Sequence, residues 1–219
     1  MTGWFEVGFL TEEIAAALNA HFGLTLVVSE MTNYWIEENL PTPEMGKWLA
    51  DQFNRSVFYS NVAPDFTAIA ALQAMHKGGY ELIVASDRPP HTKGATDRWL
   101  TKWNVPFDEL VIKGPGGKRA VAERYGPGDP LIVVDDDPKK MTYIPRAGVE
   151  LWSPARPWTP RDWRSYAGVT VFGAWTELLE YLGLPTAVPI PTFSRGVVPE
   201  AVRPQGEPVE EQLEHPRAG

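Results

Sequence analysis

The chain has 219 residues and no cysteine, which allows one well-buried domain with an appendage and excludes disulfides and thiolate metal sites. Its formal net charge of -8 argues against a broad nucleic-acid-binding surface, although it is compatible with a local basic pocket for a phosphate. No apolar run approaches the roughly 20 residues of a membrane span, and the N-terminus lacks the pattern of a signal peptide. We therefore expect a soluble cytoplasmic protein without a membrane partner.

The first third of the chain is predicted to be mainly helical. Residues 8–22 carry apolar side chains at near-helical spacing, and Gly23 follows as a typical C-terminal cap. Residues 43–55 and 64–77 are predicted as two further helices, each of which begins at a proline. Aromatic side chains are frequent in and around these helices: Tyr34, Trp35, Trp48, Phe53, Phe58 and Tyr59.

From Tyr80 onwards the pattern changes to strands that alternate with helices. Short apolar segments predict strands at 81–85, 109–112, 131–134, 149–152 and 169–172. The segments between and after them predict helices at 91–103, 118–125, 139–146 and 174–182. This alternation indicates an α/β fold, in which a parallel sheet has helices on both faces. Residues 185–219 are rich in proline and poor in apolar periodicity, so we predict a disordered tail there.

Three consecutive carboxylates, Asp135, Asp136 and Asp137, directly follow the apolar run 131–134. A strand without alternation is buried on both faces, and ligands of open α/β sheets bind at the carboxyl ends of the strands. Carboxylates that gather at such an edge repel one another unless a cation neutralises them, and their oxygens suit magnesium or calcium. The alternative is a solvated turn in which an Asp caps a helix that begins at Pro138.

Two further segments carry side chains that suit phosphate binding. Ser86 and Arg88 follow the strand 81–85, where a hydroxyl can donate a hydrogen bond and a guanidinium can make a bidentate contact. Lys118 follows a glycine-rich segment at the start of a predicted helix, although the segment does not match the Walker A pattern. The alternatives are an ordinary turn at Ser86 and an exposed helical lysine at Lys118.

The order of these segments resembles the haloacid dehalogenase (HAD) phosphohydrolases. Ser86 matches the second motif of that superfamily, Lys118 the third, and Asp135-Asp136 the fourth. Within the superfamily the chain is most similar to 5'(3')-deoxyribonucleotidases and related phage or bacterial 5'-nucleotidases. The segment 5–10 (Phe-Glu-Val-Gly-Phe-Leu), the segment 86–89 (Ser-Asp-Arg-Pro) and Trp175 carry this likeness, which covers roughly residues 4–184.

One element of the family pattern is absent from the sequence. HAD enzymes begin with a strand that ends in D-x-D-G, whose first Asp is the nucleophile, whereas this chain has no Asp before Asp51. The alignment of the segment 5–10 places both catalytic aspartates, and the central strand that carries them, upstream of Met1. Either the reading frame starts further upstream or the protein is a phosphate-binding pseudoenzyme. The cost of losing a central strand favours the first explanation, because unpaired buried backbone groups each cost about 1–3 kcal/mol.

The resemblance implies a three-layer, Rossmannoid HAD-like domain over residues 1–184, with a small helical cap at about 16–75. It implies a Mg²⁺-dependent phosphatase of (deoxy)nucleoside 5'-monophosphates, present here as an inactive form without its nucleophile. Lys118 and Ser86 would be catalytic, and both would bind phosphate together with Arg88. Asp136 would bind the metal directly, and Asp135 would either be an alternate ligand or support the metal from the second coordination shell.

The cap aromatics Tyr34, Trp35, Trp48 and Phe58 are candidates for stacking on the base, or else form the ordinary core of the cap. The alternatives for the whole protein are a non-catalytic nucleotide-binding module and a phosphatase of nucleic-acid ends. The sequence is compatible with a homodimer but does not determine the oligomeric state.

Overall fold

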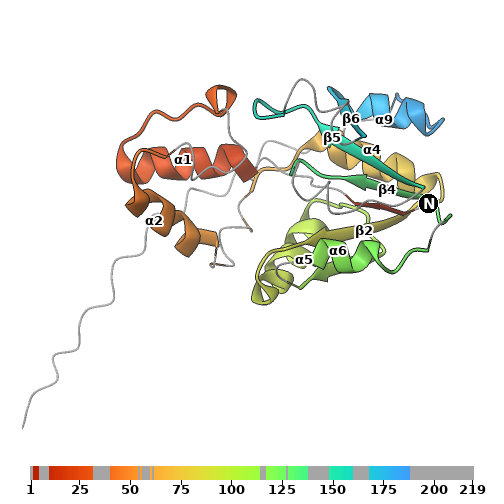
Figure 1. Cartoon of the computed structure of the whole chain (residues 1–219), viewed down its shortest axis with the longest axis horizontal. Coiled ribbons are helices and arrows are strands. Elements are labelled where there is room, and N and C mark those ends of the chain that lie inside the picture. Colours follow the sequence, from red (N-terminus) through yellow and green to blue (C-terminus); the bar gives the residue numbers. More distant parts are fainter. Residues whose placement is uncertain are drawn as a thin grey trace, which may run out of the picture.

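The structure is a computed structural model that describes residues 2–4, 10–31, 40–53, 55, 60, 62–113, 117–126, 128–137, 148–159 and 168–187. Within these residues six parallel strands form one sheet in the order β3-β2-β1-β4-β5-β6 (Figure 1). The strands are β1 (Thr2–Trp4), β2 (Glu81–Ser86), β3 (Glu109–Ile112), β4 (Leu131–Val134), β5 (Val149–Pro154) and β6 (Val169–Phe172). The predicted parallel α/β sheet is confirmed, and every residue of β4 is buried, as its uninterrupted apolar run requires.

The central strand of the sheet lies within the chain, so the prediction that it lies upstream of Met1 is wrong. Thr2–Trp4 form β1, which pairs with β2 through Gly3 and Leu82 and with β4 through Gly3 and Ile132. A three-residue segment with a glycine has neither an apolar run nor alternation, so it carries no local strand signal. Its strand conformation depends on backbone pairing with a neighbour on each side.

Helices cover both faces of the sheet, which gives the predicted three layers. Leu82 and Val84 of β2 belong to a core shared with α4 (Phe66–Lys77), α5 (Lys93–Lys102) and α9 (Trp175–Tyr181). Ile83 and Ala85 of the same strand face the other way, towards α6 (Gly117–Ala122). This alternation follows from the two-residue period of a strand.

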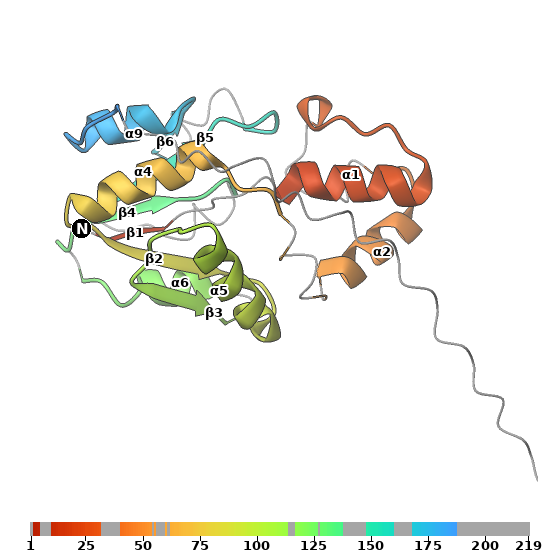
Figure 2. The same cartoon turned by 180° about the vertical axis from the view of Figure 1, so that it is seen from behind.

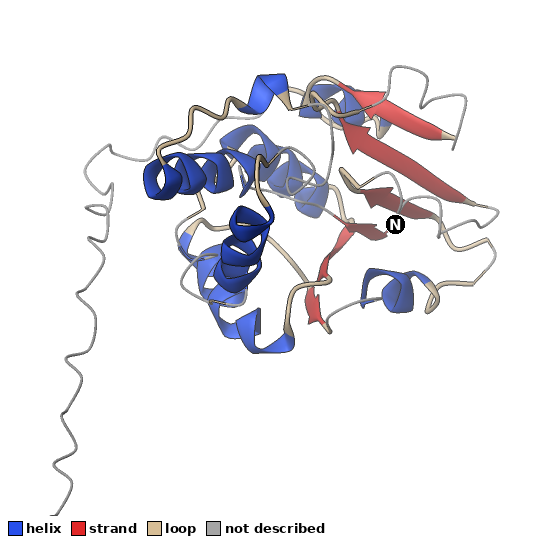
Figure 3. Cartoon of the chain, turned by 60° about the vertical axis from the view of Figure 1, so that its left-hand side comes forward, coloured by secondary structure: helices blue, strands red, loops and turns tan. Residues whose placement is uncertain are grey.

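A small helical cap lies beside the sheet (Figure 2), and its side chains form a core of their own. It comprises α1 (Leu10–Phe22), a short 3-10 turn at Val28–Glu30 and α2 (Pro43–Phe53). Ile14 and Leu18 of α1 pack with Leu49 of α2 in a cluster separate from the two clusters of the sheet. Figure 3 shows that the strands point towards these helices, so the cap faces the carboxyl edge of the sheet.

The predicted cap of about 16–75 is too long at its C-terminal end. The helix α4 packs through Ile69, Leu72 and Met75 against the sheet and against α9, so it belongs to the main domain. Helical periodicity shows that one face is apolar, but it does not show which partner covers that face. The predicted helix at 139–146 and most of the predicted tail, from residue 188, lie outside the described residues. No helix of the described chain is long and apolar enough to cross a bilayer.

Candidate phosphate site at the sheet edge

The predicted site residues lie next to β1, where the order in which the chain adds strands to the sheet reverses. The chain passes from β1 to β2 on one side, and β4 adds to the other side of β1. In open α/β sheets ligands bind outside the carboxyl ends of the strands at such a switch point. Ser86 is the last residue of β2, Lys118 is the second residue of α6 after β3, and Asp135 directly follows β4. The structure therefore places the three predicted motifs around the end of β1.

An ion pair between Lys118 and Asp135 connects segments that belong to opposite sides of β1. The Lys118 Nζ atom lies 2.5 Å from the Asp135 Oδ2 atom, and the side chains are 16% and 5% exposed. Lys118 comes from the helix after β3, whereas Asp135 follows β4, and β2 and β1 lie between these strands. The alternative of a freely exposed helical lysine is therefore wrong. The structure holds this cation near the carboxyl ends of the central strands.

Backbone contacts fix the two segments on the β2 side of the site. The N–H of Lys118 donates to Asp87 Oδ1 at 3.3 Å, which ties the start of α6 to the segment after β2. The N–H of Arg88 donates to Ser86 Oγ at 3.3 Å, so the predicted turn is present at Ser86. Arg88 also donates from Nη1 to Thr96 Oγ1 of α5 at 3.4 Å. The turn and the phosphate-binding role are compatible, because a hydroxyl that accepts a hydrogen bond can still donate one.

The three aspartates after β4 are all buried, which excludes the solvated-turn alternative. Asp135, Asp136 and Asp137 are 4%, 9% and 0% exposed. The N–H of Asp137 donates to Asp135 Oδ1 at 2.9 Å, and the N–H of Asp135 donates to the Trp152 carbonyl of β5 at 3.1 Å. Buried carboxylates need hydrogen-bond donors or cations, because burial without a partner disfavours the charged form.

The described residues do not form a magnesium site by themselves. Nowhere in the described chain do three His, Cys, Asp or Glu side chains gather at metal-binding distances. Asp135, one of the two predicted ligands, already contacts Lys118. Asp136 is the other predicted ligand, and its role as a metal ligand stays a prediction. A divalent cation, when bound, would supply positive charge next to the phosphate.

The predicted base-stacking residues are described only in part. The Trp48 ring of α2 stacks on His21 of α1, with ring centres 4.6 Å apart and 18° between the planes. Trp48 also packs edge to face with Phe22, with ring centres 5.6 Å apart. These contacts belong to the packing between the two cap helices. Tyr34, Trp35 and Phe58 lie outside the described residues.

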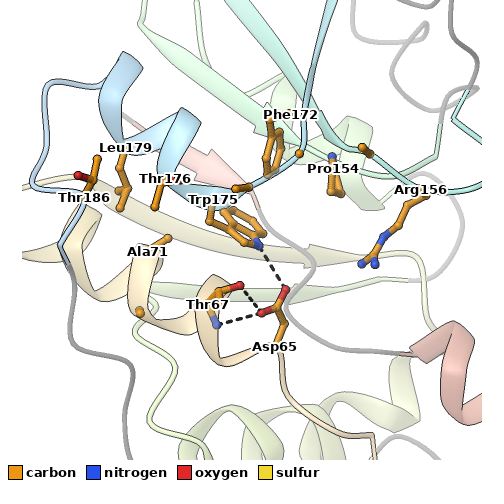
Figure 4. A pocket seen from close by; sticks show the side chains of 14 residues that line it. Asp65, Thr67, Ala71, Pro154, Arg156, Phe172, Trp175, Thr176, Leu179 and Thr186 are labelled. Atoms are coloured by element: carbon orange, nitrogen blue, oxygen red, sulfur yellow. Dashed lines mark hydrogen bonds between the residues drawn. The ribbon is translucent and has the colours of Figure 1, made fainter.

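Sequence reasoning did not single out the segment after β5, which carries Arg156 and Trp158. Trp158 is buried in the core of the cap, so this segment connects the cap to the sheet. Arg156 lines a cavity of about 350 Å³ together with Asp65, the N-terminal cap of α4 (Figure 4). The sequence does contain one signal for Arg156: like Arg88, it follows a predicted strand. The position belongs to no motif of the HAD phosphohydrolases, so the resemblance did not point to it.

No protein-family model matches the chain, and no curated protein sequence matches it. Solved structures do match its fold. The HAD family hydrolase from Deinococcus radiodurans R1, solved with bound phosphate and sodium, has a TM-score of 0.57 at 18% identity, over 83% of this chain and 93% of that one.

A predicted phosphatase from Clostridium acetobutylicum also has a TM-score of 0.57, at 15% identity, over 83% of this chain and 96% of that one. A predicted phosphoglycolate phosphatase from Haemophilus somnus has a TM-score of 0.52 at 14% identity, over 83% and 97% of the two chains. At these identities the likeness establishes the architecture. The chain has the HAD-like Rossmannoid fold.

Proposed function

We propose that the carboxyl edge around β1 and β4 binds the phosphate of a phosphomonoester. The observation that carries the proposal is the Lys118–Asp135 contact of 2.5 Å at the switch point of the sheet. The Lys118 ammonium would attract an anion to the carboxyl ends of the strands, which is where open α/β sheets bind their ligands. The resemblance of the sequence to nucleotidases makes a (deoxy)nucleoside 5'-monophosphate the ligand class that we propose.

Asp135 has a definite part in this proposal. Its carboxylate holds the Lys118 ammonium in one place, which reduces the conformational entropy that the lysine would lose when phosphate binds. The Ser86 hydroxyl, at the end of the neighbouring strand, is the proposed neutral donor to the phosphate. The Arg88 guanidinium follows two residues later and is a further candidate donor. Under this proposal Ser86, Lys118 and Asp135 act on one phosphate, although they follow strands that lie on both sides of β1.

The charges of the site also give a reason to test magnesium. Asp135, Asp136 and Asp137 are buried near Lys118, so a phosphate dianion would enter a region where the described carboxylates outnumber this lysine. A divalent cation bound to Asp136 would reduce this repulsion. We therefore propose that phosphomonoester binding is stronger in the presence of Mg²⁺.

We further propose that the chain of 219 residues binds the phosphomonoester without hydrolysing it. The resemblance implies an aspartate as the nucleophile, directly after the strand that corresponds to β1, and the sequence has no Asp before Asp51. Asp135 is unsuited to replace it, because its carboxylate is held by Lys118. A dinucleotide-binding protein can have the same strand order, but the residues that follow β1, Phe-Glu-Val-Gly-Phe-Leu at 5–10, do not contain the G-x-G-x-x-G sequence.

Titration calorimetry with deoxyuridine 5'-monophosphate and with deoxyuridine, each with and without Mg²⁺, tests this proposal. We expect the nucleotide to bind and the nucleoside to bind at least about tenfold more weakly. Lys118→Met should weaken nucleotide binding by about tenfold or more, whereas Lys102→Met, which removes an exposed lysine of α5, should not. Equal binding of nucleotide and nucleoside would contradict the phosphate site.

A phosphate-release assay on the same samples distinguishes binding from hydrolysis. We expect no Mg²⁺-dependent release of phosphate above the rate of the uncatalysed reaction. Release that Lys118→Met abolishes would show that the chain is a phosphatase and that another residue serves as its nucleophile.

A further inference from the structure

A cavity lies on the other part of the carboxyl edge, next to β5 and β6. It has a volume of about 350 Å³ and lies between the start of α4, the start of α9 and the ends of both strands (Figure 4). Its lining contains none of Ser86, Arg88, Lys118 or the three aspartates after β4. A volume of this size is within the range of small-molecule sites, which are mostly apolar with a few polar groups.

Arg156 is the cation of this cavity. Its Nε atom is buried and has no hydrogen-bond partner among the residues that the structure describes. Its backbone is held in place, because the Arg156 N–H donates to Thr159 Oγ1 at 2.9 Å and the neighbouring Ala155 N–H donates to the Phe172 carbonyl at 2.7 Å. Figure 4 shows the guanidinium extending from the segment after β5 towards the side of the cavity where Asp65 lies. A buried N–H of this kind needs an acceptor, and a ligand can supply it.

Asp65 does not take the place of that acceptor. Its Oδ1 atom accepts from the N–H groups of Thr67 and Ala68 at 2.9 and 3.2 Å and from Thr67 Oγ1 at 2.6 Å. Its Oδ2 atom accepts from Trp175 Nε1 at 3.3 Å. The carboxylate therefore serves as the cap of α4 and joins α4 to α9, and the ion pairs among the described residues do not include one between Asp65 and Arg156.

The remaining walls are suited to an apolar body. Phe172 and Trp175 pack edge to face with ring centres 5.2 Å apart, and Ala71 and Leu179 add aliphatic surface. The cavity thus combines one guanidinium, one carboxylate that is already hydrogen-bonded, and an aromatic wall. Asp65 repels a phosphate dianion more strongly than a monoanion, so the single guanidinium is matched best by a singly charged planar anion.

We propose that this cavity binds a small monocarboxylate with an aromatic or branched apolar body, whose carboxylate contacts Arg156. The apolar body then occupies the space against Trp175 and Leu179. This site is separate from the phosphate site, and it does not depend on the function proposed for that site.

Calorimetric titrations of the full chain with benzoate, benzamide and phenyl phosphate test the proposal. Benzamide has the shape of benzoate without its charge, and phenyl phosphate has the larger charge. We expect benzoate to bind with a dissociation constant of about 1 mM or tighter, and benzamide to bind at least about tenfold more weakly. Phenyl phosphate bound at this cavity should be weaker than benzoate, and Lys118→Met should remove any stronger binding of it at the phosphate site.

Two variants locate the binding. Arg156→Gln should weaken benzoate binding by about tenfold or more, and Thr176→Phe should block it, because Thr176 is an exposed cavity residue of α9 where a larger side chain does not disturb the core. Glu180→Gln, at an exposed position of the same helix outside the cavity lining, is the matched control and should bind benzoate like the wild type.

Each outcome decides for or against the site. Loss of benzoate binding in Arg156→Gln and Thr176→Phe, with retention in Glu180→Gln and Lys118→Met, supports it. Benzoate binding that Lys118→Met abolishes, that Arg156→Gln leaves unchanged, or that is absent up to about 10 mM overturns it. Because the phosphate site is tested by Lys118→Met, failure of one proposal leaves the other intact.

Discussion

The two parts of the carboxyl edge hold their cations in opposite ways. On the β1–β4 side the Lys118 ammonium lies 2.5 Å from Asp135 and is part of the folded structure before any ligand arrives. On the β5–β6 side the Arg156 Nε has no partner within the described chain and faces a cavity. Removing one partner of a buried ion pair destabilises the fold, and the paired cation has to contact both its partner and the ligand when a ligand binds. A cation without a partner contributes little to stability, and its hydrogen-bonding capacity is available to a ligand.

The largest effect on stability should come from Asp135→Ala. This change leaves the 16% exposed Lys118 without its Asp135 partner, and breaking a buried ion pair costs about 3–5 kcal/mol of unfolding free energy. The double variant Asp135→Ala/Lys118→Met should recover much of that loss, because the lysine charge is removed together with its partner. Urea unfolding measures both values. A loss below about 1 kcal/mol in the single variant would show that the pair behaves like an exposed one.

Magnesium should stabilise the β1–β4 side by mass action. At a concentration about 100-fold above its dissociation constant, a cation that binds only the folded state adds about 2.7 kcal/mol. Asp136→Asn should abolish the upward shift in melting temperature, whereas Asp51→Asn, at an exposed position of α2, should retain it. If magnesium shifts the wild type and Asp136→Asn equally, Asp136 is not a metal ligand.

An intermediate effect is expected at Asp65, which lines the cavity at Arg156 but also caps α4 and contacts Trp175. Asp65→Ala removes the N-terminal cap of α4 and the contact with Trp175, and loss of a cap costs about 0.5–2 kcal/mol. Thermal unfolding of this variant should show a lower midpoint than that of Asp97→Ala, which changes an exposed Asp in α5. Equal midpoints would mean that the cap contributes nothing to stability.

The smallest effect should come from Arg156→Gln. No ion pair within the described chain is lost in this variant, so we expect the unfolding free energy to change by no more than about 0.5 kcal/mol. The same urea titration measures it. A loss comparable to that of Asp135→Ala would show that Arg156 has a structural partner, and the contrast between the two cations would disappear.

The sequence predicted the β1–β4 side far better than the β5–β6 side, and the reason is physical. The uninterrupted apolar run of β4 marks a doubly buried strand, and Asp135 follows it directly, so the local pattern contains both the strand and the acid. Lys118 and Ser86 could be assigned to the same edge because parallel strands end there. The ion pair between Lys118 and Asp135 was not predicted, because it depends on the order of the strands in the sheet, which no local pattern records.

Other parts depend on tertiary contacts that no local pattern records. Thr2–Trp4 become the central strand only because β2 and β4 pair with them on either side. The helix α4 was assigned to the cap because its apolar face could cover either the cap or the sheet. The cavity at Arg156 exists because α4 and α9 lie together above the ends of β5 and β6, which are distant in sequence from α4.

Phosphorus-31 NMR of deoxyuridine 5'-monophosphate tests the phosphate site most directly, because the signal comes from the phosphate itself. We expect the wild-type protein to broaden and shift this resonance, Lys118→Met to abolish the effect, and Arg156→Gln to leave it unchanged. A resonance that is unaffected by the wild-type protein, or that responds equally to Lys118→Met, would contradict a phosphate site at the end of β1.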